Sequence, residues 1–207
     1  IILLIIILLL VMYTYKLIDN EEISEFTYIP NFLGYKDYSI TKDWLLSLSY
    51  IKGYTNSGKQ IDREQIWFEP NNNYFCKVWK ERTDRWLPHK YHNTLTKIQT
   101  IISTKTNVEI DSCLVNKYKD GNDIIAPHKD NSISFGIYPT IIIYSIGETR
   151  EMKINNDITK KSKLFSLEDN SVFIMSGASQ KHYTHEIIKS DTKNVRYSLT
   201  FRKYINK

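Results

Sequence analysis

The chain has 207 residues, with 28 Lys and Arg against 23 Asp and Glu, which gives a formal net charge of +5. A hydrophobic fraction of 42% with only seven Gly and five Pro excludes a disordered, collagen-like or low-complexity chain, and the length fits one domain with a full core. The two cysteines form no CxxC pair, which argues against structural zinc and favours a reducing intracellular compartment, the nucleus or the cytoplasm.

The first twelve residues, IILLIIILLLVM, are all apolar, and no charge appears before Lys16. A membrane span needs about 20 apolar residues, and no small-residue cleavage site follows the run. We expect residues 1–18 to form a separate apolar segment, either a truncated membrane anchor or a docked or artefactual segment. We expect residues 19–207 to form the folded domain, as a monomer.

Between this segment and residue 109 the pattern predicts one strand and two helices. Phe26–Leu33 alternates apolar with other residues and then reaches a proline, as a short strand entering a turn does. Ser39–Ile51 and Tyr91–Thr104 carry apolar residues at steps of three and four, which is typical of amphipathic helices. Residues 61–86 form a region in which aromatic residues alternate with charge.

From Glu109 onward the sequence pattern changes to short segments rich in β-branched and aromatic residues and separated by turns, from EIDSCLVNKY to VRYSLTFRKY. Several short strands at this spacing predict a sandwich or barrel. The expected fold class is therefore α+β and mainly β, with two helices and the aromatic region packed on a C-terminal β-domain.

A candidate metal site comes from the motif APHKD and a later histidine. His128 and Asp130 are two residues apart, so their side chains share one face of an extended chain. Together with His185 they could supply the two imidazoles and one carboxylate that hold ferrous iron in oxygenases and leave positions open for other ligands. Alone, a short HxD motif often matches by chance, and His182 is a competing ligand close by.

A candidate anion site lies on the last strand. Arg196, Ser198, Thr200 and Arg202 share one face, and the opposite face is apolar. Six residues of strand span about 20 Å, so two inward-reaching arginines leave a gap suited to a small dicarboxylate, which guanidinium groups bind through paired hydrogen bonds. Asn116 and Tyr118 also share a face and offer an amide and a phenol. The alternative is a solvated outer face.

The order of these motifs resembles the AlkB-like family of iron- and 2-oxoglutarate-dependent dioxygenases. The matching stretches are, in chain order, NKYKDG, PHKD, YSIGETR, VFIMSGASQ, the single His185 and RYSLTFR. The resemblance implies a double-stranded β-helix, or jelly-roll, core preceded by N-terminal helices and a substrate lid, and it implies that His128, Asp130 and His185 bind Fe(II).

The resemblance also implies the other roles of the anion-site residues. Arg196 would pair with the distal carboxylate of 2-oxoglutarate, with help from Tyr118 and Ser198. Arg202 and Asn116 would lie near its keto-acid end, and Thr200 shares the same strand face. O2 would be the third reactant.

The activity implied by the resemblance is oxidative demethylation of alkylated bases such as 1-methyladenine and 3-methylcytosine in DNA or RNA. It is coupled to decarboxylation of 2-oxoglutarate to succinate and releases formaldehyde, as in DNA repair and RNA demethylation. Residues 61–86 would form the lid. The residues expected to contact substrate are the lid aromatics Trp67, Phe68 and Tyr74, the two arginines Arg63 and Arg150, and Ser132, which stands where many relatives carry an acid.

Two other functions stay open on the sequence. The same iron chemistry could act on a protein side chain or a lipid, a reading that the apolar N-terminus favours. The chain could also be a catalytically silent, membrane-tethered binding module, against which the three filled ligand positions speak.

Overall fold

The computed structural model describes residues 12–54, 60–76 and 87–205. Its described strands are β1 Tyr13–Asp19, β2 Glu22–Ile29, β3 Ile51–Tyr54, β4 Gln60–Phe68, β5 Ser112–Tyr118, β6 Ile125–His128, β7 Ile141–Gly147, β8 Arg150–Asn156, β9 Ser162–Leu167, β10 Ser171–Gly177, β11 Tyr183–Ile187 and β12 Arg196–Arg202. Its described helices are α1 Tyr35–Ser47, α3 Asn93–Thr106, α4 Ser132–Phe135 and α5 Ser179–His182.

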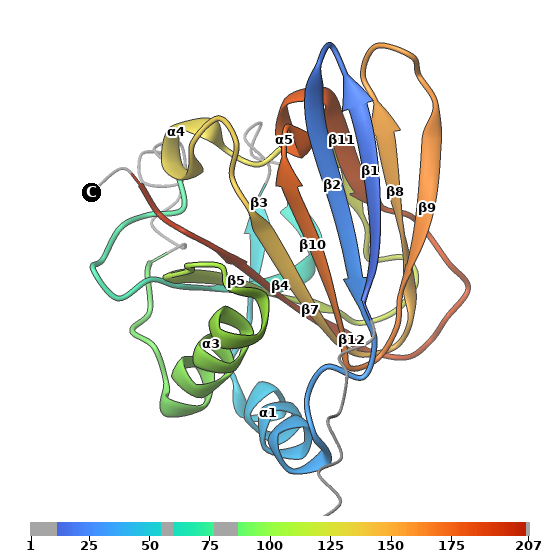
Figure 1. Cartoon of the computed structure of the whole chain (residues 1–207). Helices are drawn as coiled ribbons and strands as arrows, with labels where there is room; N and C mark the ends of the chain where they lie inside the picture. Colours follow the sequence, from blue (N-terminus) through green and yellow to red (C-terminus); the bar gives the residue numbers. More distant parts are fainter. Residues whose placement is uncertain (1–11, 55–59, 77–86, 206–207) are drawn as a thin grey trace, which may run out of the picture.

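The described strands form two antiparallel sheets. The larger has the order β1-β2-β10-β7-β12-β5-β4-β3, and the smaller has the order β6-β11-β8-β9. The small sheet covers one face of the large sheet, and α1 and α3 cover the other (Figure 1). The mainly β fold with a jelly-roll core and flanking helices is thus confirmed.

Both faces of the central strand β7 are buried, which explains why its sequence IIIYSIG is apolar at nearly every position. Ile141 and Ile143 pack with side chains of the small sheet, whereas Ile142, Tyr144 and Ile146 pack with the helices. Successive side chains of a strand point to opposite faces, so a strand between two layers carries apolar residues on both faces. The exception, Ser145, accepts a hydrogen bond from Arg196. The face of the large sheet that is turned toward β6 and β11 forms one wall of the candidate site.

The helices begin and end a few residues from their predicted bounds. α1 is Tyr35–Ser47 rather than Ser39–Ile51, and α3 is Asn93–Thr106 rather than Tyr91–Thr104. At the start of α3 the His92 side chain accepts a hydrogen bond from the backbone N–H of Thr94 at 3.2 Å. A side chain that satisfies a free N–H of the first turn fixes where a helix starts.

The predicted N-terminal boundary at residue 18 is wrong for the described residues. Tyr13–Asp19 is strand β1 and pairs along its whole length with β2, so the folded domain begins before residue 19. Residues 1–11, the rest of the expected apolar segment, lie outside the described residues. Among the residues that are described, no helix has both the length and the apolar character to cross a membrane.

The aromatic region 61–86 is not a single lid. Its first part belongs to β4, which pairs with β5 in the large sheet from Glu64 to Phe68. Residues 77–86 lie outside the described residues. Within β4 the alternation of charged and apolar residues reflects the two faces of a sheet strand.

Candidate active site

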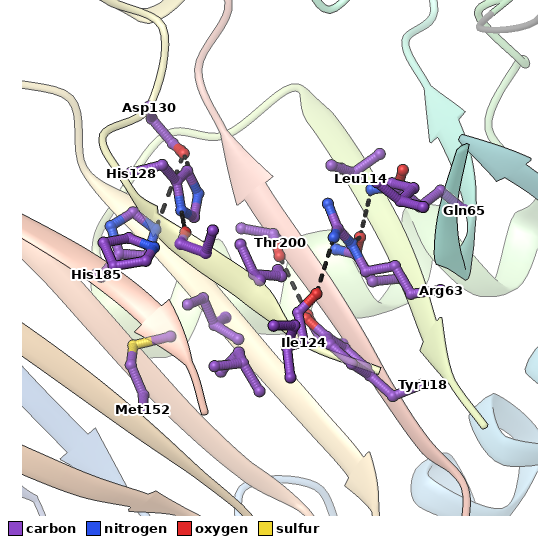
Figure 2. A pocket seen from close by; sticks show the side chains of 18 of the residues that line it. Arg63, Gln65, Leu114, Tyr118, Ile124, His128, Asp130, Met152, His185 and Thr200 are labelled. Carbon is purple, nitrogen blue, oxygen red and sulfur yellow. Dashed lines mark hydrogen bonds and ion pairs between the residues drawn. The ribbon is translucent and has the colours of Figure 1, made fainter. Parts of the chain in front are cut away.

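The three predicted metal ligands meet between two neighbouring strands of the small sheet. His128 ends β6 and His185 lies in β11, and the two are paired directly across the antiparallel ladder. Asp130 follows β6 by two residues. Pairing of β6 with β11 therefore brings together residues that are far apart in the sequence (Figure 2).

The distances between the donor atoms suit one metal ion. Nε2 of His128 lies 3.8 Å from Oδ1 of Asp130, and Nε2 of His185 lies 4.0 Å from the same oxygen. Metal–nitrogen bonds of about 2.1 Å allow donor atoms to be at most about 4.2 Å apart. The donor atoms of the three residues all lie within 4.8 Å of one another, so a small rotation of a side chain completes the set.

The protonation states also suit a metal. Burial lowers the pKa of His185 to about 3, and burial lowers the pKa of His128 as well, so both imidazoles are neutral at physiological pH. Burial opposes ionisation of Asp130, but the Arg202 guanidinium and His185 outweigh it and hold the pKa of Asp130 at about 2. The site therefore presents two lone pairs and one negative charge, which is the donor set of a ferrous facial triad.

Neighbouring groups fix the orientation of these ligands. Nδ1 of His128 lies 3.0 Å from the carbonyl oxygen of Ala126, so this nitrogen donates and leaves Nε2 for the metal. The backbone N–H of Asp130 donates to Oε1 of Gln180 at 3.0 Å. The sequence reasoning missed Gln180, although it lies in the quoted stretch VFIMSGASQ.

His182, the competing ligand, contacts Glu22 and not the other metal ligands. Its Nε2 lies 2.6 Å from Oε2 of Glu22 at the start of β2. The structure therefore does not bring His182 to the other ligands.

The expected anion-binding face of β12 opens into the same cavity. Arg196, Ser198, Thr200 and Arg202 line a cavity of about 730 Å³ together with the three metal ligands. Tyr197, Leu199 and Phe201, which alternate with them, are buried in the core beneath the helices. Asn116 and Tyr118 of β5 also line the cavity, because β5 pairs with β12 and places Asn116 opposite Ser198.

Arg196 has the features of an anion ligand. The side chain is only 1% exposed, its Nη2 donates to Oγ of Ser145 at 2.9 Å, and its guanidinium lies 4.9 Å from the Tyr118 ring centroid. Its Nε and Nη1 have no hydrogen-bond partner among the described residues. A buried guanidinium with free N–H groups calls for an acceptor, and a carboxylate of 2-oxoglutarate supplies one.

Arg202 instead contacts the metal ligand directly. Its Nε donates to Oδ2 of Asp130, and its Nη1 donates to the carbonyl oxygen of Thr200 at 3.1 Å. Oδ1 of Asp130 is thereby left for the metal. Arg202 thus joins the anion-binding face to the metal ligands.

Two of the expected lid aromatics are in the wrong place to stack on a base. Trp67 is 1% exposed and packs against Leu114, Phe135 and Tyr204, and Phe68 is 4% exposed and packs in the core against Trp44. Neither lines the cavity. Both lie on β4, and their side chains are buried on opposite faces of the large sheet. The prediction that they stack on a base is therefore wrong.

Three other substrate-contact predictions do not match the cavity lining. Tyr74 is half-buried and Ser132 is exposed at the start of α4, and neither lines the cavity. Asn131, next to Ser132, does line it. Arg150 is 1% exposed, and its guanidinium donates to backbone carbonyl oxygens of the loop before β6 and of Ile188, so its position is structural.

Arg63 does line the cavity, on the strand that the sequence reasoning assigned to the lid. Its Nη1 donates to the carbonyl oxygen of Ile124 at 3.0 Å, and its Nε donates to Oδ1 of Asn116 at 3.1 Å. Gln65, two residues on, lines the cavity too and was missed. Gln65 is two residues from Arg63, a spacing that puts both side chains on one face of a strand. This spacing was overlooked because the segment was assigned to a lid.

Comparisons with known proteins agree with this site. Residues 25–202 match the model of the 2OG-Fe(II) oxygenase superfamily. Human "Alpha-ketoglutarate-dependent dioxygenase alkB homolog 3" is 30% identical over 212 residues, covering 90% of this chain and 72% of that protein. The chain is an AlkB-like 2OG-Fe(II) oxygenase.

Two more relatives extend the comparison of this AlkB-like oxygenase. The bovine "DNA oxidative demethylase ALKBH2" is 23% identical over 129 residues, covering 58% of this chain and 45% of that protein. The solved structure of OsALKBH1 superposes with a TM-score of 0.61 at 15% sequence identity, covering 86% of this chain and 96% of that chain. The second likeness supports the fold.

As an AlkB-like oxygenase, the enzyme uses Fe(II), 2-oxoglutarate and O2. The donor set of His128, Asp130 and His185 fits the metal, and the free N–H groups of Arg196 fit the dicarboxylate. When bound, iron and 2-oxoglutarate supply the hydroxylating chemistry. The protein's contribution is to orient them and to keep the reaction away from bulk water.

Proposed function

We propose that this AlkB-like oxygenase removes methyl groups oxidatively from alkylated bases of the 1-methyladenine and 3-methylcytosine type in DNA or RNA. The products are the repaired base, formaldehyde, succinate and CO2. One observation carries the proposal: the metal ligands and the guanidinium of Arg196 line one cavity of about 730 Å³, which has room for a base beside the cosubstrate. The similarity to a DNA oxidative demethylase supports the choice of substrate class.

The residues of the chain divide the work within this cavity. His128, Asp130 and His185 hold the metal, and Arg196 and its neighbours on β5 and β12 orient the cosubstrate beside it. Apolar side chains around the ligands, such as Ile143, Met152 and Ile187, exclude water from the space where a methyl group would react. Because a base in a duplex is stacked, the substrate base must leave the stack to enter.

The cavity wall also contains Phe75, a ring that sequence reasoning passed over. It packs edge-on to Phe135, and the Arg202 guanidinium lies 5.2 Å from its centroid. Trp67 and Phe68 are buried in the core, and Tyr118, which also lines the cavity, lies against Arg196 on the cosubstrate side. Among the described residues, Phe75 is therefore the aromatic side chain better placed to contact a base. We therefore assign the stacking role to Phe75 in place of those two residues.

The test is turnover on short methylated DNA and RNA oligonucleotides with Fe(II) and 2-oxoglutarate. Formaldehyde and succinate should form in equal amounts with methylated strands, and neither should exceed background with the unmethylated strands of the same sequence. His128→Ala should abolish both products. Binding of the oligonucleotides should weaken steeply with salt, because phosphate contacts release counterions.

Turnover of 2-oxoglutarate without demethylation of any strand would contradict the nucleic-acid substrate and direct the search to protein or lipid substrates. Absence of iron-dependent turnover on every substrate would contradict the enzyme itself.

A further inference from the structure

A row of polar side chains crosses the inner face of the large sheet at the cavity. Gln65 on β4 pairs with Asn116 on β5, and Asn116 pairs with Ser198 on β12. Gln65 is 1% exposed and Asn116 is 3% exposed, and all three line the cavity. Buried polar groups in such a row need hydrogen-bond partners, so the contacts between them determine how each one points.

Both contacts from β4 reach one oxygen atom. Nε2 of Gln65 donates to Oδ1 of Asn116 at 2.5 Å, and Nε of Arg63 donates to the same Oδ1 at 3.1 Å (Figure 2 shows Arg63 and Gln65 side by side, across the cavity from the metal ligands). An amide oxygen has two lone pairs, so two donors use it fully. The N–H groups at Nδ2 of Asn116 are then left for the cavity.

The direction of this amide follows from the chemistry of its partners. A guanidinium is charged at all relevant pH values and can only donate, so the atom of Asn116 that faces Arg63 must be oxygen. Arg63 is itself held by its second hydrogen bond, to the carbonyl oxygen of Ile124. Since Asn116 offers oxygen to β4, Gln65 must offer its Nε2 in return.

We infer that Gln65 is a positioning residue for 2-oxoglutarate, which acts by holding the Asn116 amide so that Nδ2 donates to a cosubstrate oxygen. Arg63 sets the direction of the amide and Gln65 locks it. β4, which the sequence assigned to the substrate lid, is therefore part of the wall that binds the cosubstrate.

The experiment measures binding of 2-oxoglutarate to the Fe(II)-loaded chain by calorimetry in the absence of O2, so no turnover is involved. Gln65→Glu places a carboxylate beside Oδ1 of Asn116, where it repels the amide oxygen and competes with it for the Nε of Arg63. The Asn116 amide then loses both donors that hold it. We expect affinity to fall about tenfold or more, the effect of one lost hydrogen bond to a charged group. Gln65→Met removes the donor but leaves Arg63 in place, so its affinity should fall less.

The matched control is Gln99→Glu. Gln99 lies on α3 away from the cavity, and its Nε2 donates to the carbonyl oxygen of Ile110, so the same change costs a similar hydrogen bond without touching Asn116. Its affinity for 2-oxoglutarate should equal that of the wild type. Thermal unfolding of all variants shows whether a loss of affinity merely follows a loss of stability.

A double-substitution cycle tests whether Gln65 acts through Asn116. In an Asn116→Ala background, Gln65→Met should have no further effect on affinity, because the group that it positions is gone. Losses that simply add would overturn the inference, as would wild-type affinity in Gln65→Glu. This readout needs no nucleic acid, so failure of demethylation on oligonucleotides would leave the inference standing.

Discussion

The buried guanidinium of Arg150 offers a sharp test of how this domain is held together. Arg150 begins β8, and its Nη1 donates to the carbonyl oxygen of Asp120 at 3.0 Å. Its Nη2 lies within 3.2 Å of the carbonyl oxygens of Gly121, Asp123 and Ile188. The guanidinium thus links two segments by hydrogen bonds. One is the loop before β6, which ends at His128, and the other is the chain just after β11, which contains His185.

The cost of removing this group can be worked out from its contacts. Nη2 carries two N–H groups and shares them among three acceptors, so Arg150 makes about three full hydrogen bonds through its two terminal nitrogens. At roughly 1–1.5 kcal/mol net for each bond, Arg150→Met should lower the free energy of unfolding by about 3–5 kcal/mol. For a domain of this size that loss lowers the Tm by roughly 6–20 °C.

Urea unfolding followed by circular dichroism measures this loss, and calorimetry gives the Tm. Arg150→Lys is the control, because lysine keeps the charge but cannot reach all the carbonyl oxygens. Its free energy of unfolding should therefore lie between those of the wild type and Arg150→Met. If Arg150→Met kept wild-type stability and instead lost only oligonucleotide affinity, the structural role would be refuted and the original substrate-contact prediction restored.

Three further predictions concern the cavity. Arg196→Met should weaken 2-oxoglutarate binding roughly a hundredfold, about 2.7 kcal/mol. The free energy of unfolding should fall by only about 1 kcal/mol, because the change loses the hydrogen bond to Ser145 but also removes buried N–H groups that lack partners. Calorimetry measures the binding and thermal unfolding the stability, and a loss of stability as large as that expected for Arg150→Met would contradict the prediction. Fe(II) at a hundred times its Kd should stabilise the metal-free chain by about 2.7 kcal/mol, and this thermal shift should vanish in His128→Ala. Burial lowers the pKa of His185 from 6.5 to about 3. Between these two pH values the imidazole is protonated in the unfolded chain but not in the folded one, so the free energy of unfolding of the metal-free protein should fall from pH 6.5 toward pH 3. In urea titrations at several pH values, His185→Phe should show a smaller fall.

Much of the site could be predicted because its residues lie on strands with a two-residue repeat. The spacing of Arg196 from Ser198, like that of Asn116 from Tyr118, assigns each pair to one strand face, and the structure places all four in the cavity. The same repeat separated the core residues of β12 from its polar ones. Local spacing carries this information because strand geometry alone fixes which side chains share a face.

The errors fell where the local pattern had two interpretations. Trp67 and Phe68 look like lid aromatics beside charged residues, but pairing of β4 with β5 buries one on each face of the sheet. Arg150 looks like a phosphate contact, but the fold surrounds its guanidinium with backbone carbonyl oxygens. Whether an aromatic or basic side chain meets solvent, substrate or core depends on which strand lies beside it.

Residue types and their spacing were enough to predict the chemistry of the centre: two imidazoles and a carboxylate for the metal, arginines on a strand face for the dicarboxylate, and a mainly β domain to carry them. Three features needed the folded chain: Arg202 binds Asp130, β4 lies in the wall of the cavity, and Gln65 and Arg63 donate to one oxygen of Asn116. The reason is physical. Residue type and spacing set what a side chain can donate or accept, whereas its partner is set by strand pairing between segments far apart in the chain.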